Sequence, residues 1–490
     1  MASPLIPLLS LALCTATSAA TVTSRPLVLY VDPTSERLHV LPSLERRGCD
    51  CVVLHSAAAA AAILQNAGED DDELRERVLE RVVPPAGTET AWAEECLGLS
   101  DGTLLLSAVL CGSDGGLADA ERLQDALLPA RSNGCNPARR DKYLMNEQMR
   151  AAGLGAPLQC TPASWDETRS FLRGALGSSY PVVMKPRRGQ ASVLVGLAHD
   201  EEQAAHMDAI LRDPAVRVSI DSSEHAAGDA NVVVQEYLAG DEWVVDTVSR
   251  DGEHKVVALW RYDKGEANGA PFVYFGIEAR GVEGHVERQL LAYCRKALDA
   301  LGWRWGPCHI EVKMVPGRGA PNDGMDGDGA DGNGADGDGA GGDAMPVLIE
   351  INAGRWNGEE FLPLAQLCNG LDALEATLDA YLDAAAWTHV PSTPPETLSV
   401  HGTNVKLVSH VEGRLLAAPS EAHAGTLRAL KSLLSFHPEV NEVGAHVVRT
   451  VDLNTCAGYC HLAHTDESVV ARDYRALRKL QPRLFEIEGS

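Results

Sequence analysis

PVLIEIN, residues 346–352, and CHIEVKMV, residues 308–315, are two apolar runs of strand length that polar side chains interrupt. Glu350 and Asn352 stand at alternate positions, so their side chains share one face of a strand. Glu311 interrupts the other run. If the two strands pair, three oxygen ligands converge, and Mg2+ prefers such ligands. The two runs therefore predict a paired sheet with a magnesium site at Glu311, Glu350 and Asn352.

These acids have a second interpretation, as structural residues in salt bridges. Carboxylates that are buried without a cation repel each other, and their pKa values rise. Ion pairs recover the cost of burial only when their geometry is good. The magnesium site is therefore the stronger interpretation.

Between the two strands lies a tract rich in Gly, Asp, Ala and Asn. Residues 323–343 contain seven aspartates and no basic residue, and such a composition cannot bury enough apolar surface to fold. We expect residues 316–345 to form a disordered, solvated insertion that joins two paired strands. A calcium loop is disfavoured because no Glu closes a twelve-residue pattern.

Several polar residues upstream could hold a nucleotide. A triphosphate needs fixed cations, backbone N–H donors and a divalent metal. Lys142 begins a helix, and Lys185 ends an apolar strand, where a lysine has no packing role. QEYL, residues 235–238, ends another apolar strand and could present backbone groups and Glu236 to a base, with Glu242 near the ribose. Surface lysines and sheet-edge acids are the alternative interpretation.

The first part of the chain alternates apolar strands with helices. Strands are predicted at residues 27–32, 51–55 and 104–110, and a Gly-rich turn and a helix at 117–128 follow the third strand. This succession predicts a small doubly wound parallel sheet. The G-x-G-x-x-G spacing is absent, so the glycines indicate a tight turn and not a nucleotide site.

A proline-rich break at residues 391–395 precedes the last region. Short strands are predicted at residues 403–407 and 446–451, and helices at about 427–434 and 469–480. We therefore expect a small α+β region at the C-terminal end.

Length and charge narrow the class of protein. A chain of 490 residues exceeds one ordinary core, so two or three domains are expected. The formal net charge of -27 disfavours nucleic acid as a partner, because like charges repel the phosphate backbone. No run of about 18 apolar residues occurs, so we expect no membrane span and no membrane partner.

The cysteines and the N-terminal segment bear on the compartment. The twelve cysteines are scattered, and most stand in apolar contexts, as is typical of thiols in a reduced compartment. Residues 1–24 contain an apolar run that could be a targeting segment, although a disordered tail fits as well. The sequence favours an intracellular location, in the cytoplasm or an organelle such as a plastid, over secretion.

Taken in order, these motifs resemble the ATP-grasp superfamily. The resemblance is carried by RRDK at 139–142, VVMKP at 182–186, QEYL with Gly240 and Glu242, GPCHIE at 306–311 and EIN at 350–352. Each piece is weak alone, but the ordered set is specific and covers most of the chain. Within the superfamily, the chain is most similar to carboxylate–amine ligases that make dipeptides or similar amides, relatives of D-alanine–D-alanine ligase and carnosine synthase.

The resemblance implies the domain organisation. Residues 25–138 would form a doubly wound preATP-grasp domain, residues 139–388 an ATP-grasp domain of two α+β subdomains, and residues 396–490 the C-terminal α+β region. The fold class is thus a mixture of α/β and α+β.

The resemblance also implies how ATP is held. Lys142 and Lys185 would contact the phosphates, Glu236 and Leu238 the adenine, and Glu242 the ribose. Mg2+, with Mn2+ as a substitute, would be held by Glu311, Glu350 and Asn352.

Two departures from the family pattern concern the reacting end of the site. The loop that covers the phosphates is usually richer in Gly and Ser than RRGQAS, residues 187–192. The family often has an Arg two residues after the metal-binding Asn, whereas Arg355 stands one place later. Arg355 is nonetheless the candidate catalytic residue, because the flexible Gly354 could restore its reach.

The function that the resemblance implies is ATP-dependent ligation of a carboxylate to an amine through an acylphosphate, with release of ADP and phosphate. The substrates would be small molecules, with amino acids favoured, and a homodimer is the default assembly. Arg261, Arg280 and His309 could bind substrate carboxylates or form structural ion pairs. The alternatives are another ATP-grasp ligase and a non-catalytic ATP-binding protein.

Overall fold

The computed structural model describes residues 25–33, 40–66, 76, 78–97, 105–189, 193–214, 216, 232–317 and 344–488. The segment 1–24, residues 190–192 of the phosphate loop and most of the insertion at 316–345 lie outside the described residues. The chain divides into two compact units, Met1–Cys135 with Thr377–Trp387, and Asn136–Ala376 with Thr388–Ser490.

The first unit contains the parallel sheet that the sequence predicts. Its strand order is β2 (Asp50–Leu54), β1 (Pro26–Val31) and β3 (Leu105–Cys111), and both pairs are parallel. The helices of this part are α1 (Val40–Arg46), α2 (Ala57–Asn66), α4 (Glu89–Leu97) and α5 (Leu117–Leu127). The apolar face of α5 packs on the sheet, where Leu123 joins Leu29 and Val31 in one core.

The second unit begins with a small antiparallel sheet in the order β4-β7-β5-β6. The strands are β4 (Gln159–Cys160), β7 (Val232–Glu236), β5 (Val182–Pro186) and β6 (Gly196–Ala198). Two helices, α7 (Trp165–Arg173) and α8 (Glu201–Arg212), pack on it, whereas α6 (Lys142–Ala151) places Met145 and Met149 in the core of the large sheet. Leu172 of α7 and Leu211 of α8 pack with Met184 of β5 in one core.

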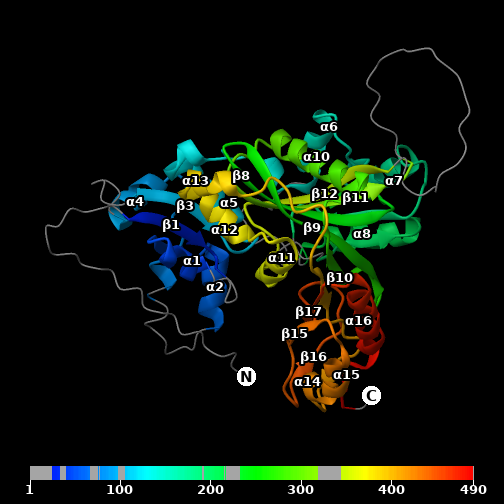
Figure 1. The fold of residues 1–490 in the computed structure, drawn as a ribbon. Coiled ribbons are helices and arrows are strands. Elements are labelled where there is room, and N and C mark those ends of the chain that lie inside the picture. Colours follow the sequence, from blue (N-terminus) through cyan, green and yellow to red (C-terminus); the bar gives the residue numbers. More distant parts are fainter. Residues whose placement is uncertain are drawn as a thin grey trace, which may run out of the picture. The chain divides into compact units, whose positions relative to one another are not determined.

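A large antiparallel sheet forms the centre of this unit, in the order β12-β11-β8-β9-β10-β13-β17-β15 (Figure 1). Its first five strands are β12 (Met345–Ala353), β11 (Gly306–Val315), β8 (Asp241–Arg250), β9 (Glu253–Ala267) and β10 (Ala270–Ala279). The long helix α10 (His285–Ala300) covers one face, and its Leu290 and Leu298 share a core with Val245 and Ile310. On the other face, α11 (Leu362–Asn369) places Leu364 in the core of Trp260 and Ile277.

The C-terminal segment extends this sheet. The three added strands are β13 (His401–Lys406), β17 (Gly458–His464) and β15 (Leu433–Pro438). Its other helices and short strands are β14 (Gly413–Arg414), α14 (Pro419–Ala422), α15 (Ala424–Ala429), β16 (His446–Val447) and α16 (Glu467–Leu480). Before this segment come α12 (Ala373–Leu382) and α13 (Ala384–His389), most of which belong to the first unit. None of the helices in the described part of the chain is long and apolar enough to cross a membrane.

Two predictions in the C-terminal segment are wrong. The helix expected at about 427–434 ends at Ala429, and residues 433–438 form β15. The cause is tertiary pairing, because Leu433 lies opposite Leu462 of β17 and strand pairing overrides local helix propensity. The strand expected at 446–451 contains only His446 and Val447.

A candidate ATP-binding site

Most of the predicted site residues surround one cavity of about 110 Å³. The cavity lies where the small sheet faces β8, β9, β11 and β12 of the large sheet. Seven of the nine predicted residues line it, namely Lys142, Lys185, Glu236, Leu238, Glu242, Glu311 and Glu350. Lys142 and Glu350 are 208 positions apart in the chain. The fold therefore brings together residues that are distant in the sequence.

The two acidic strands pair as the sequence predicts. β11 and β12 are antiparallel, and their register places Glu311 opposite Glu350 and His309 opposite Asn352. Burial alone would raise the pKa of Glu311, but the ammonium of Lys264 and the imidazole of His309 hold it well below its usual range. Glu311 is therefore an ionised carboxylate in a half-buried setting.

The two predicted lysines approach these acids from the small-sheet side. The Nζ of Lys142 lies 2.8 Å from Oε1 of Glu350 and also donates a 2.6 Å hydrogen bond to the carbonyl of Gly189. Lys185 is buried at the end of β5. Burial, with the nearby charge of Lys142, lowers its pKa to about 8. Two cations thus stand beside the carboxylates at one end of the cavity.

The other predicted nucleotide contacts lie on β7 and the segment that follows it. Oε1 of Glu236 accepts a 2.7 Å hydrogen bond from the backbone N–H of Leu158, so its side chain is held at the strand end. Leu238 lines the cavity together with Val183 of β5. Glu242 is buried and forms an ion pair with Lys264.

Lys264 is a site residue that the sequence analysis missed. Its Nζ lies 4.4 Å from the ring centre of Tyr262 and 3.9 Å from that of Tyr274, as well as beside Glu242. Burial would lower the pKa of Lys264, but Glu242 and the neighbouring groups raise it instead. The sequence contains a signal that could have identified Lys264. Tyr262 and Lys264 stand at alternate positions of β9, so both lie on the face of the sheet that carries Glu242.

Two predicted residues do not line the cavity. Asn352 is half-buried on β12, two positions beyond Glu350 on the same face. Arg355 follows Gly354, whose φ of +108° is in the left-handed region, and its Nε donates to the carbonyl of Trp356 at 3.3 Å. The catalytic role of Arg355 stays a prediction.

The three residues suggested for substrate carboxylates have different surroundings. His309 is buried and its Nδ1 lies 2.8 Å from Oδ1 of Asp246. Burial would lower the pKa of His309, but its contacts with Asp246 and Glu311 raise it to about 9. Arg280 lies 3.5 Å from Glu278 and 3.7 Å from Glu467, whereas Arg261 is exposed on β9.

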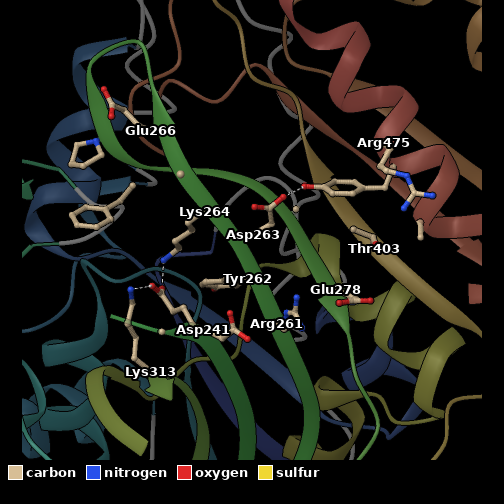
Figure 2. Close-up of a pocket in the computed structure, with 18 of the residues that line it drawn as sticks. Asp241, Arg261, Tyr262, Asp263, Lys264, Glu266, Glu278, Lys313, Thr403 and Arg475 are labelled. Carbon is tan, nitrogen blue, oxygen red and sulfur yellow. Dashed lines mark hydrogen bonds and ion pairs between the residues drawn. The ribbon is translucent and has the colours of Figure 1, made fainter. Parts of the chain in front are cut away.

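A larger cavity of about 870 Å³ adjoins the first, and the two share Tyr237, Glu242, Lys264, Phe272 and Lys313. Figure 2 shows Lys264 and Lys313 reaching inward from different strands, while Thr403 and Arg475 enter from the C-terminal segment. Part of the surface next to the candidate nucleotide site therefore comes from β13 and α16.

The donor set fits a magnesium ion that is shared with a nucleotide. In the described part of the chain, no three His, Cys, Asp or Glu side chains are grouped so as to hold a metal by themselves. One or two carboxylates are nevertheless the usual protein share of a Mg2+ site, because this ion keeps waters and takes phosphate oxygens as its other ligands. Glu311 and Glu350 are two such carboxylates on the wall of the cavity, and Asn352 lies two positions beyond Glu350 on the same face of β12.

Comparison with known proteins agrees with this geometry. Residues 178–319 match a family model described as the ATP-grasp domain. Over 304 residues the chain is 28% identical to dapdiamide A synthase of Enterobacter agglomerans. That match spans 60% of this chain and 65% of the synthase, so it covers less than two thirds of the relative's length.

Solved structures share the fold along nearly the whole chain. An L-amino acid ligase from Bacillus licheniformis has a TM-score of 0.61 at 15% identity, over 95% of this chain and 99% of that one. A carboxyaminoimidazole ribonucleotide synthase from Aspergillus clavatus, solved with ATP, has a TM-score of 0.55 at 13% identity over 94% and 99%. The predicted mixture of α/β and α+β structure is confirmed, and the chain shares its fold with these structures, with residues 178–319 matching the ATP-grasp domain model.

Proposed function

We propose that this protein is an ATP-dependent carboxylate–amine ligase that forms an amide bond between small molecules, amino acids in particular. One observation carries the proposal. Lys142, Lys185, Glu311 and Glu350 surround a single cavity, so two cations face two carboxylates as a Mg-ATP site requires. The similarity to dapdiamide A synthase and the fold shared with an L-amino acid ligase favour amino-acid substrates over other carboxylates.

In the first step, a carboxylate oxygen of one substrate attacks the γ-phosphorus of ATP, and ADP leaves. Lys142 and Lys185 offset charge on the transferred phosphoryl group, which is mainly a matter of positioning and electrostatics. Glu236 and Leu238 contact the adenine, and Glu242 the ribose. Mg2+, when bound by Glu311, Glu350 and Asn352, supplies further positive charge at the phosphates.

In the second step, the amine nitrogen of the other substrate attacks the acyl carbon of the acylphosphate. Phosphate leaves, and the nitrogen loses a proton. Arg355 is proposed to contact the transferred phosphate or a substrate carboxylate. The protein forms no covalent bond to the substrate in this scheme, so its contribution is to orient the reactants and to exclude water from the acylphosphate.

The test is phosphate release from Mg-ATP across a panel of amino-acid pairs, with Glu311→Ala and Glu350→Ala beside the wild type. Glu201→Ala is the matched control, because Glu201 is an acid on α8 whose partner is Arg173, outside the cavity. We expect release that requires both an acid and an amine, and that falls at least about a hundredfold in the two site variants. ATP binding without release on any pair would favour a non-catalytic ATP-binding protein.

A further inference from the structure

A hydrogen-bonded group of side chains lies beside the candidate metal ligands on the same face of the large sheet. Asp246 of β8 is buried, and its two carboxylate oxygens have different donors. The indole Nε1–H of Trp260 donates to Oδ2 at 2.8 Å, and the imidazole Nδ1 of His309 donates to Oδ1 at 2.8 Å. Both donors come from neighbouring strands, since β8 pairs with β9 and with β11.

These contacts fix the plane of the imidazole ring. An ionised carboxylate only accepts hydrogen bonds, so Nδ1 carries the proton that points to Asp246. His309 and Asp246 are also directly opposite each other in the register of β11 and β8. The ring is therefore held from one side, and its Nε2 points the other way.

The Nε2 of His309 faces a candidate metal ligand. It lies 3.5 Å from Oε1 of Glu311 and 3.5 Å from the hydroxyl of Tyr262. His309 and Glu311 are two positions apart on β11, so their side chains are neighbours on one face. The chain of contacts thus runs from Trp260 through Asp246 and His309 to Glu311.

We propose that Asp246 and His309 are positioning residues that hold the carboxylate of Glu311 in the orientation needed to bind the divalent cation. Trp260 fixes the far end of the group. The inference rests on the proposed function, because it assigns Glu311 to the cation. Hydrogen bonds to the residues that hold a metal commonly govern its affinity, and their loss weakens binding about tenfold to a hundredfold.

The position of Asp246 argues against two other roles. A cation ligand beside the nucleotide would have to reach the cavity, but Asp246 does not line it, and its two oxygens accept hydrogen bonds from Trp260 and His309. A purely structural pair is a poor explanation as well, because taking two ionisable groups out of water is expensive and apolar residues would fill the same space at less cost. This pair differs from a purely structural one because the Nε2 of His309, which does not contact Asp246, faces Glu311.

Two substitutions of His309 test the contacts of its two ring nitrogens separately. The amide nitrogen of an Asn side chain reaches the place of Nδ1, so His309→Asn keeps the bond to Asp246 and loses the contact with Glu311. The amide nitrogen of Gln reaches the place of Nε2, so His309→Gln keeps the approach to Glu311. We expect His309→Asn and Asp246→Asn to weaken cation binding by at least about tenfold, with His309→Gln closer to the wild type.

The measurement is Mn2+ binding to the full-length protein in the presence of ADP, followed by electron paramagnetic resonance. In parallel, phosphate release is measured as a function of Mg2+ concentration. A positioning role raises the Mg2+ concentration needed for half-maximal release, and most of the maximal rate returns when Mg2+ is saturating. Trp260→Phe removes only the indole N–H that donates to Asp246, so it should weaken Mn2+ binding by a smaller factor. This variant tests the inference if Asp246→Asn does not fold.

The matched control is His254→Asn. His254 is also a buried histidine of the large sheet with an Asp partner, since its Nε2 lies 3.2 Å from Oδ1 of Asp299 on α10. It does not line the cavity. Its substitution should leave Mn2+ affinity unchanged.

The outcomes are distinct. Mn2+ affinities within twofold of the wild type in both His309→Asn and Asp246→Asn would overturn the inference, as would a wild type that binds no Mn2+ with ADP. A lost maximal rate with unchanged Mn2+ affinity would also overturn it, because His309 would then act on the reactants. If the variants weaken Mn2+ binding but no acid and amine pair releases phosphate from the wild type, the positioning role stands and the proposed ligase activity fails.

Discussion

The ammonium of Lys185 is buried at the end of β5, and its titration predicts how stability depends on pH. Its pKa is lowered from 10.5 to about 8, with burial as the main cause. Between these two values the unfolded chain holds more protons than the folded one, so the free energy of unfolding rises as the pH rises through this window. Below pH 8 the lysine is charged in the folded protein, and its burial lowers the free energy of unfolding.

Lys185→Met should therefore stabilise the protein at neutral pH while abolishing ATP turnover. We expect the free energy of unfolding at pH 7 to rise by up to about 3 kcal/mol, with the gain shrinking as the pH approaches 10.5. Urea denaturation at pH 7 and pH 9.5 measures the difference. Lys296→Met, at an exposed position of α10, is the control; a loss of stability in Lys185→Met would show that a partner holds the ammonium.

Lys264 and Glu242 form a second buried charge pair, and here both partners depend on each other. Lys264→Met leaves the carboxylate of Glu242 buried with only Lys313, 4.0 Å away, as a neighbour among its ion-pair partners in the described part of the chain. We expect a loss of about 3 kcal/mol of unfolding free energy, because an uncompensated buried charge is costly. The double variant Lys264→Met/Glu242→Gln should recover most of it in urea denaturation, and additive losses would contradict the coupling.

At the scale of elements, the turn between β7 and β8 determines where Glu242 lies. Gly240 has a φ of +113°, and a Cβ atom there would lie 1.9 Å from the carbonyl oxygen of Met314 on β11. Any other residue must therefore shift either the turn or the neighbouring strand. The turn leads into β8, which carries Glu242, and β11 carries Glu311, so the shift would reach residues on two strands of the cavity.

Gly240→Ala should lower the thermal midpoint and weaken ADP binding, as measured by calorimetry. The matched control is Gly252→Ala in the β8–β9 turn, where φ is +84° and no atom lies within 4 Å of the added Cβ. That variant should cost only about 1 kcal/mol of backbone strain and leave ADP affinity unchanged. Equal effects in the two variants would show that the contact with Met314 is easily relieved.

The acidic residues of β11 and β12 show what the sequence could predict. Alternation along a strand fixes which side chains share a face, so Glu350 and Asn352 could be grouped from their spacing alone. That both strands place their acids toward one cavity followed once the strands were neighbours, whereas the register that sets Glu311 opposite Glu350 comes from the structure. Local patterns of this kind, together with the family resemblance that the ordered motifs carry, predicted the fold and seven residues that line the cavity.

Residues that meet across strands could not be found in this way. Asp246 and His309 are 63 positions apart, and whether they face each other depends on register. The sheet contains irregularities between Asp246 and Thr247 and between Glu311 and Val312. Each one changes which side chains are opposite, and none leaves a signal in the sequence.

At the scale of the whole chain, the C-terminal segment is part of the central sheet. β13 pairs with β10, and β17 and β15 follow it. Residues of β13 and α16 also line the larger cavity beside the candidate site. Removing this segment would expose the edge of β10 and the apolar side chains that pack against it, which favours aggregation.

We expect a chain that ends at residue 395 to be insoluble or to aggregate, even though it keeps every predicted site residue. Expression of this fragment, with size-exclusion chromatography of the soluble fraction, measures the effect. A chain lacking only residues 320–340 is the control and should remain folded, because these residues join two strands that already pair. A monomeric truncated chain that binds ADP would contradict the expectation.

The strand ends on either side of that insertion offer a use in protein engineering. Val315 and Met345 lie opposite each other in register, so a guest domain whose own ends are close together can be spliced between them without stretching the sheet. The splice point is four residues from Glu311 along β11 and five from Glu350 along β12. A circularly permuted fluorescent protein placed there is a design for an optical reporter of nucleotide binding, and a change in its fluorescence on addition of ADP is the measurement that tests the design.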